Sequence, residues 1–136
     1  MHPTPAILGT TLVTILAIVV YIVTTVRVGA MRIKFDVKAP AVSGHPMFER
    51  AFRVQMNTLE RLPIFLPLLW LAAAFFAPQP AVAPLLGLVW VVGRVLYMTG
   101  YMRDPDKRGL GFGISALAEI LLLLTALWGV VTAMIV

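Results

Sequence analysis

Long apolar segments alternate with two short polar stretches along this chain. Every Asp, Glu, Lys and Arg except Glu119 lies in Arg27–Arg61 or in Arg94–Arg108. A helix of about 20 apolar residues is long enough to cross the hydrocarbon layer of a bilayer. The pattern therefore predicts an all-α fold, an integral membrane four-helix bundle that forms one domain over residues 1–136, with spans at about 5–26, 47–77, 81–103 and 110–135.

Prolines mark both ends of the second predicted helix. Pro78 and Pro80 separate the second span from the third, because proline cannot continue a helix interior. Pro46 is well placed to begin the second helix. From residue 47 to residue 77 this helix would be about 45 Å long. It is longer than the hydrocarbon is thick, so we expect its polar beginning to lie at the membrane surface.

Composition agrees with a membrane protein and limits its chemistry. Hydrophobic residues make up 60% of the chain, which would leave a soluble domain too little polar surface. The first apolar segment has no basic residue before it and is long, so we expect an uncleaved span rather than a signal peptide. The chain has no cysteine and two histidines, His2 and His45, so we expect no catalytic thiol and no metal site.

The distribution of Lys and Arg predicts an orientation. These residues gather in the loops after the first and third spans. The positive-inside rule then places both loops in the cytoplasm and both termini on the non-cytoplasmic side. The net charge of +5 suits an anionic leaflet or an anionic ligand. A bacterial inner membrane and an endoplasmic reticulum fit equally well, and we expect no nucleic acid partner because the basic residues are few and lie next to the membrane.

A stripe of polar side chains marks the beginning of the second helix. Arg50, Arg53, Asn57 and Glu60 follow one another at steps of three, four and three residues, so they share one face, with Arg61 beside them. Such groups would be costly in contact with lipid. Membrane anchoring needs neither an amide nor a carboxylate. We therefore expect the stripe to face another helix, another subunit or a ligand.

A second stripe lies on the third helix at the same membrane face. Arg94, Tyr97 and Tyr101 recur at steps of three and four residues, and the following loop adds basic residues up to Arg108. An arginine-rich pocket with one carboxylate suits a small zwitterion with more negative than positive charge, whose ammonium Glu60 would bind. The other basic residues are interpreted as interfacial anchors: Arg27, Arg32, Lys34, Lys38 and Lys107.

The two stripes also carry a family resemblance. Residues 48–66, FERAFRVQMNTLERLPIFL, resemble the helix-two signature of the MAPEG proteins, the membrane-associated proteins in eicosanoid and glutathione metabolism. Residues 93–101, GRVLYMTGY, with Arg108 beyond them, are similar to the helix-three segment of that family. The family includes microsomal glutathione transferases and leukotriene C4 synthase.

The resemblance implies a function, an assembly and a set of site residues. Family members are homotrimers that bind glutathione as co-substrate between subunits near the cytoplasmic face. The implied activity is a glutathione transferase acting on lipophilic electrophiles from the lipid bilayer, with hydroperoxide reduction as a side activity. Arg108 matches the arginine that stabilises the glutathione thiolate. The implied glutathione contacts are Arg53, Gln55, Asn57, Glu60, Arg61, Tyr97 and Tyr101, with Arg32 from the end of the first helix.

Two positions stand apart from this pattern. Arg61 occupies a place where many members have tyrosine, so one glutathione contact is altered. Glu119 lies about 13–14 Å into the fourth span, where a carboxylate is a functional candidate. We expect Glu119 to pair with Arg94, to accept hydrogen bonds from the second helix, or to be protonated. Arg50, Arg94 and Glu119 are grouped as structural or of unassigned role.

Two alternatives to the enzyme remain open at this point. The chain could be a non-catalytic, lipid-binding scaffold of the same family, although such a scaffold has no need of a tripeptide site. It could also be a small four-helix exporter that uses Glu119. Exporters of that kind place the carboxylate in the first span, which here has no charge.

Overall fold

The computed structural model describes residues 4–76 and 78–135, and it confirms the all-α four-helix prediction. Each of the four long helices is long and apolar enough to cross a membrane. A short 3₁₀ helix, η1, precedes the last of them. The elements are α1 (Pro5–Phe35), α2 (Pro46–Phe75), α3 (Val82–Arg103), η1 (Pro105–Arg108) and α4 (Gly109–Ile135).

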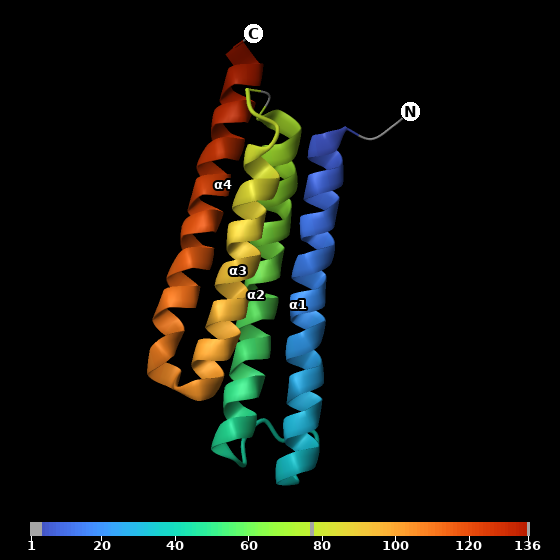
Figure 1. Cartoon of the computed structure of the whole chain (residues 1–136), viewed down its shortest axis with the longest axis vertical. Coiled ribbons are helices and arrows are strands. Elements are labelled where there is room, and N and C mark those ends of the chain that lie inside the picture. Colours follow the sequence, from blue (N-terminus) through green and yellow to red (C-terminus); the bar gives the residue numbers. More distant parts are fainter. Residues whose placement is uncertain (1–3, 77, 136) are drawn as a thin grey trace.

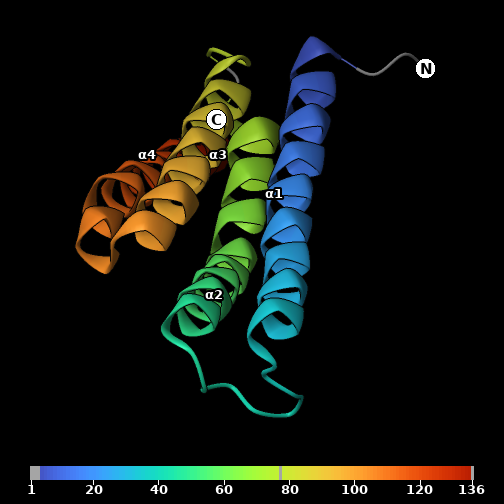
Figure 2. The same cartoon turned by 60° about the horizontal axis from the view of Figure 1, so that its bottom comes forward.

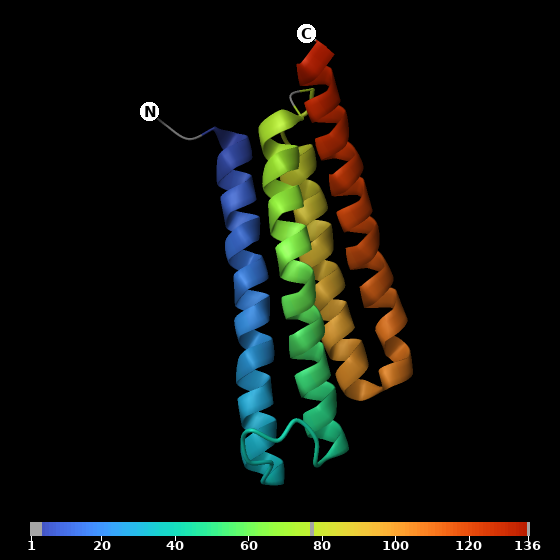
Figure 3. The same ribbon diagram turned by 180° about the vertical axis from the view of Figure 1, so that it is seen from behind.

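The helices stand side by side in an up-and-down bundle (Figure 1). α1 packs on α2 and α3, while α4 packs on α3 and α2, so α2 and α3 lie between the two outer helices (Figure 3). The loop between α1 and α2 lies at the same end as the turn between α3 and α4 (Figure 2). Both charged stretches therefore meet at one end of the bundle, as the sequence pattern predicted.

The helix boundaries differ most from the predicted spans at the end of α1, and α2 ends at Phe75 rather than at residue 77. α1 continues past residue 26 to Phe35, because residues 27–35 contain no proline and their polar side chains can extend the helix beyond the hydrocarbon. It ends at Asp36, whose backbone is left-handed (φ 51°, ψ 41°) and whose N–H donates to the carbonyl of Arg32. Residue 77, the predicted end of the second span, and residues 1–3 and 136 of the predicted domain lie outside the described residues.

The core of the bundle is built around a pair of stacked rings. Phe65 of α2 and Trp90 of α3 are both fully buried, and their ring centroids are 3.9 Å apart with planes 3° from parallel. Aliphatic side chains from all four helices complete this core: Val13, Ala17, Leu62, Leu69, Ala72, Ala83, Ala118, Leu122 and Ala126. The outward faces of the helices carry exposed apolar side chains, as expected for surfaces in lipid.

Two glycines allow α3 and α4 to approach closely near the charged end. A Cβ atom on Gly93 would lie 2.7 Å from the backbone nitrogen of Ser115, and one on Gly111 would overlap the backbone of Tyr97. Only a residue without a side chain fits at these contacts. The backbones therefore touch, and this contact holds Tyr97 against the beginning of α4.

Candidate functional site

A cavity of about 410 Å³ opens at the charged end of the bundle. Three helices and the 3₁₀ turn contribute to its walls. Five residues that the sequence singled out come together around it: Arg53 and Asn57 from α2, Tyr97 and Tyr101 from α3, and Arg108 from η1. Gly109 and Phe112 of α4 complete the lining. The predicted meeting of the two polar stripes is confirmed.

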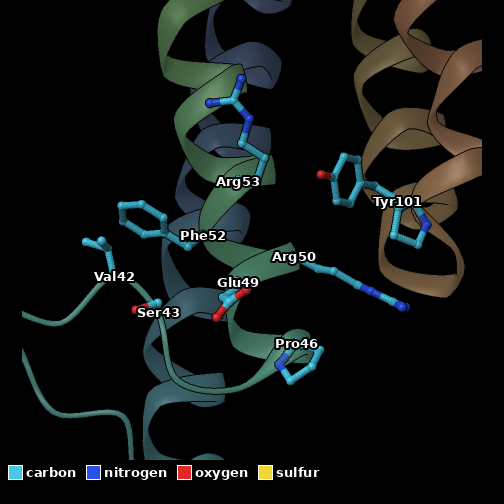
Figure 4. Close-up of a pocket in the computed structure, with 9 residues that line it drawn as sticks. Val42, Ser43, Pro46, Glu49, Arg50, Phe52, Arg53 and Tyr101 are labelled. Atoms are coloured by element: carbon cyan, nitrogen blue, oxygen red, sulfur yellow. The ribbon is translucent and has the colours of Figure 1, made fainter.

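A second cavity of about 540 Å³ adjoins the first on the side of the α1–α2 loop. Figure 4 shows Arg53 on α2 and Tyr101 on α3 at opposite sides of this opening, and both residues line both cavities. Its remaining walls come from the loop, the first turns of α2 and η1: Val42, Ser43, Pro46, Glu49, Arg50, Phe52 and Pro105. The two cavities form neighbouring spaces separated by a pair of shared side chains.

Basic residues hold the walls of this second cavity. Arg32 donates to the carbonyl of Ala41 at 2.8 Å and so fixes the loop next to Val42. Arg50 donates to the carbonyls of Met102 and Arg103, at 3.3 and 3.2 Å, and ties α2 to the last turn of α3. The structure thus agrees with a structural role for Arg50. Arg32, expected at the glutathione site, lines neither cavity.

Arg94 lies directly behind the first cavity and orients one of its walls. The side chain is 1% exposed, and it donates to Oδ1 of Asn57 at 3.0 Å and to Oγ1 of Thr58 at 2.8 Å. Its guanidinium also packs over the ring of Tyr97, 4.2 Å from the centroid. Because arginine only donates hydrogen bonds, the carbonyl oxygen of Asn57 must face Arg94. The amide NH₂ of Asn57 is left to donate elsewhere.

Glu119 takes part in a second buried polar cluster, one helical turn deeper. Arg61 of α2 donates from Nε at 3.2 Å and from Nη2 at 2.5 Å to the two carboxylate oxygens. Trp90 of α3 donates from Nε1 at 2.8 Å. The expectation that Glu119 accepts hydrogen bonds from the second helix is confirmed. The alternative in which Glu119 pairs with Arg94 is not the one observed, because Arg94 bonds to Asn57 and Thr58 instead.

The other α2 residues expected to bind glutathione lie outside the cavity lining. Glu60 is 3.8 Å from Arg53, and both side chains are more than half exposed. Gln55 faces α1 and donates to Oγ1 of Thr25 at 3.1 Å. Arg61 instead forms its ion pair with Glu119 on α4. None of Gln55, Glu60 and Arg61 lines the cavity in this chain.

The sequence interpretation missed two aromatic residues. Phe112 follows Arg108 by one helical turn and forms part of the cavity wall. Trp90 precedes Arg94 by four residues and extends the third-helix stripe inward to Glu119. Helical spacing could have found both. They were passed over because apolar aromatic residues are common in membrane spans and carry no signal of their own.

The arrangement favours the binding and stabilisation of anions. The cavity and the two clusters behind it contain four arginines and two glutamates, so positive charge is in excess by two. Guanidiniums, phenols and an amide are hydrogen-bond donors, and desolvation strengthens them. Among residues 4–76 and 78–135, no group of three or more His, Asp or Glu side chains is placed to hold a metal ion. His2 lies outside the described residues.

These features define a multi-pass integral membrane protein with an arginine-containing pocket at one end of a four-helix bundle. The model of the MAPEG family matches residues 10–128, and the chain belongs to this family. An uncharacterized protein of Synechocystis sp. is 45% identical over 85% of this chain and 83% of its own length. Microsomal glutathione S-transferase 2 of Homo sapiens is 46% identical over 74% of this chain and 66% of its own length. Leukotriene C4 synthase of Bos taurus is 37% identical over 86% of this chain and 77% of its own length.

Proposed function

We propose that this protein is a membrane-bound glutathione transferase, which joins the thiolate of glutathione to lipophilic electrophiles. The observation that carries the proposal is the convergence of Arg53, Asn57, Tyr97, Tyr101 and Arg108 on one cavity. Membership of the MAPEG family supports it, since relatives named glutathione S-transferase and leukotriene C4 synthase match most of the chain.

The charges around the cavity fit glutathione as co-substrate. The tripeptide has two carboxylates and one ammonium, and ionisation of its thiol adds a second net negative charge. The excess of two positive charges around the cavity matches this thiolate form. Arg53 would bind a carboxylate, Glu60 beside it the ammonium, and the NH₂ of Asn57 an acceptor oxygen.

Arg108 would act on the thiol. The pKa of an unperturbed thiol is about 8.5, and only the thiolate is nucleophilic. A guanidinium cannot accept the thiol proton, which passes to water, but it lowers the thiol pKa by stabilising the anion, at about 1.4 kcal/mol for each unit. The thiolate sulfur then attacks the electrophilic carbon, a C–S bond forms and the leaving group departs with its electron pair. In the side activity the thiolate would attack a hydroperoxide, which is reduced to the alcohol, and a second glutathione would convert the resulting sulfenic acid to glutathione disulfide and water.

The proposed assembly is a homotrimer with the charged end in the cytoplasm and both termini on the other side. Arg53 and Glu60 are 58% and 52% exposed in the single chain, on a face that would otherwise meet lipid or headgroups. A neighbouring subunit would cover them, which supports self-association. The second substrate would come from the bilayer. Both a bacterial inner membrane and an endoplasmic reticulum suit this orientation.

The two alternatives gain no support from the structure. A scaffold would not require five polar side chains around one cavity. An exporter would need a carboxylate free to exchange protons, whereas both Glu119 oxygens accept hydrogen bonds from Arg61 or Trp90.

Turnover tests the proposed function. The purified protein is assayed in detergent with glutathione and 1-chloro-2,4-dinitrobenzene, and with cumene hydroperoxide for the side activity. Near neutral pH we expect Arg108→Ala to lower the conjugation rate about 10- to 100-fold, in line with one or two units of thiol pKa. Lys107→Ala, the matched control, removes a neighbouring charge outside the cavity lining and should conjugate like wild type. No conjugation by wild type would contradict the proposal.

A further inference from the structure

The Arg61–Glu119 ion pair lies directly behind the inner wall of the cavity. Arg61 follows Asn57 by one turn of α2, and its guanidinium is 5.6 Å from the ring centroid of Phe112, a wall residue. The side chains of Arg61 and Glu119 are 25% and 6% exposed. Only a phenyl ring and one helical turn therefore separate this pair from the space in which a ligand would bind.

Charges in this position act over a long range. The pair lies among membrane-spanning helices, where a low dielectric weakens screening. α1 has no charged residue before Arg27. Every element that packs here contributes ionisable groups near the pair. They are Arg53 and Glu60 on α2, Arg94 and Tyr97 on α3, Arg108 on η1, and Tyr21 of α1 at the edge of the core.

Glu119 forms an ion pair with Arg61, so the formal charges of the two side chains cancel. It accepts three hydrogen bonds, two from Arg61 and one from the indole of Trp90. The pair is therefore neutral as a whole. Removal of one member exposes the cavity to the full charge of the other.

We propose that the Arg61–Glu119 pair sets the fraction of bound glutathione that is ionised at its thiol, by balancing positive and negative charge at the inner end of the cavity. This inference rests on the proposed function, and it assigns a role to two residues outside the cavity lining. Arg61 and Glu119 are positioning residues rather than catalytic residues. They touch no reacting atom, and they act on the thiol through the electric field of their charges.

The test is a pH titration of the ultraviolet thiolate band of glutathione bound to the purified protein. Glu119→Gln leaves the charge of Arg61 unbalanced, so the pH midpoint falls by about one unit. Arg61→Gln leaves the charge of Glu119, so the midpoint rises. The double variant Arg61→Gln/Glu119→Gln restores neutrality and returns the midpoint to the wild-type value. Arg61→Lys keeps the charge while losing the forked geometry, and its midpoint stays at the wild-type value.

If the Arg61–Glu119 pair only stabilises the structure, the titration midpoints follow a different pattern. Loss of either partner would then loosen the site and raise the midpoint in both single variants, and the double variant would not recover. That pattern, or identical midpoints in all variants, overturns the inference while the proposed function stands. A wild-type protein that binds glutathione without a thiolate band overturns the inference and the thiolate activation assigned to Arg108, whereas absence of conjugation overturns the proposed function. Thermal unfolding of each variant confirms that the folded protein is being titrated, and the double variant decides the question where a single substitution prevents folding.

Discussion

The guanidinium of Arg94 holds the side-chain carbonyl of Asn57, to which it donates a hydrogen bond of 3.0 Å. A second bond of 2.8 Å, to the hydroxyl of Thr58, fixes the guanidinium between neighbouring residues of α2. This contact determines which hydrogen bonds the side chain of Asn57 can make to a ligand. With its oxygen occupied, the amide offers N–H donors to the cavity that it lines.

Asn57→Asp tests whether the side chain of residue 57 donates a hydrogen bond to the ligand or accepts one from it. The aspartate would still pair with Arg94, so the protein should fold, but it could no longer donate to the ligand. We expect glutathione affinity, measured by calorimetry, to fall about 10- to 100-fold, as for the loss of a hydrogen bond to a charged group. Thr58→Val serves as the control, since it removes the second anchor of Arg94 and leaves the Asn57 amide in place. Tighter binding by Asn57→Asp would mean that this residue accepts a hydrogen bond from the ligand.

Glu119→Leu should destabilise the bundle. The substitution leaves Arg61 without its carboxylate partner among packed helices, and loss of one member of a buried pair costs about 3–5 kcal/mol. The double variant Arg61→Met/Glu119→Leu should recover most of that stability, because no unpaired charge remains. Unfolding in detergent measures both. Equal stability of the single and double variants would show that the ion pair contributes little to the fold.

Gly111→Ala should disturb the site through the backbone. The added methyl group would overlap the backbone of Tyr97 and force α3 and α4 apart. We expect lower thermal stability together with weaker glutathione binding, because Tyr97 lines the cavity. Gly113→Ala is the matched control, since nothing lies within 4 Å of its new methyl group. If the two variants behave alike, the close approach of α3 and α4 is not what positions Tyr97.

The periodicity of the sequence was enough to predict the bundle and most of the cavity. Spacing of three and four residues placed Arg53 and Asn57 on one face of α2, and Tyr97 and Tyr101 on one face of α3. Segregation of charge placed both faces at one end of the bundle. These features depend on local helix geometry alone, so they can be read from the sequence without knowledge of packing.

The partners of individual residues could not be read in this way. Glu60 and Arg61 are adjacent in sequence but point in directions about 100° apart on a helix. Glu60 stays beside Arg53, whereas Arg61 reaches Glu119 on α4. Gln55 likewise turns toward Thr25 on α1. Which helix receives each side chain depends on the packing of distant segments, which spacing along one helix does not specify.

The pH dependence of activity should reveal the role of Arg108. A cation near the sulfur lowers the thiol pKa below its usual value of about 8.5, so wild-type activity should rise through that lowered pKa as pH increases. Arg108→Ala should move the midpoint up by about one or two units and converge toward wild-type rates at high pH. A variant that is equally slow at every pH would point to a loss of binding geometry instead.

Thiolate activation by the cavity is tested most directly by an equilibrium titration of the detergent-purified protein with glutathione, in which binding and the ultraviolet thiolate band are recorded together. Wild type, Arg108→Ala and Lys107→Ala are compared at one pH near neutrality. We expect binding with a thiolate band in wild type and in Lys107→Ala, and loss of the band in Arg108→Ala. Absence of binding at millimolar glutathione would contradict the transferase, and binding without a band in wild type would contradict thiolate activation by this pocket.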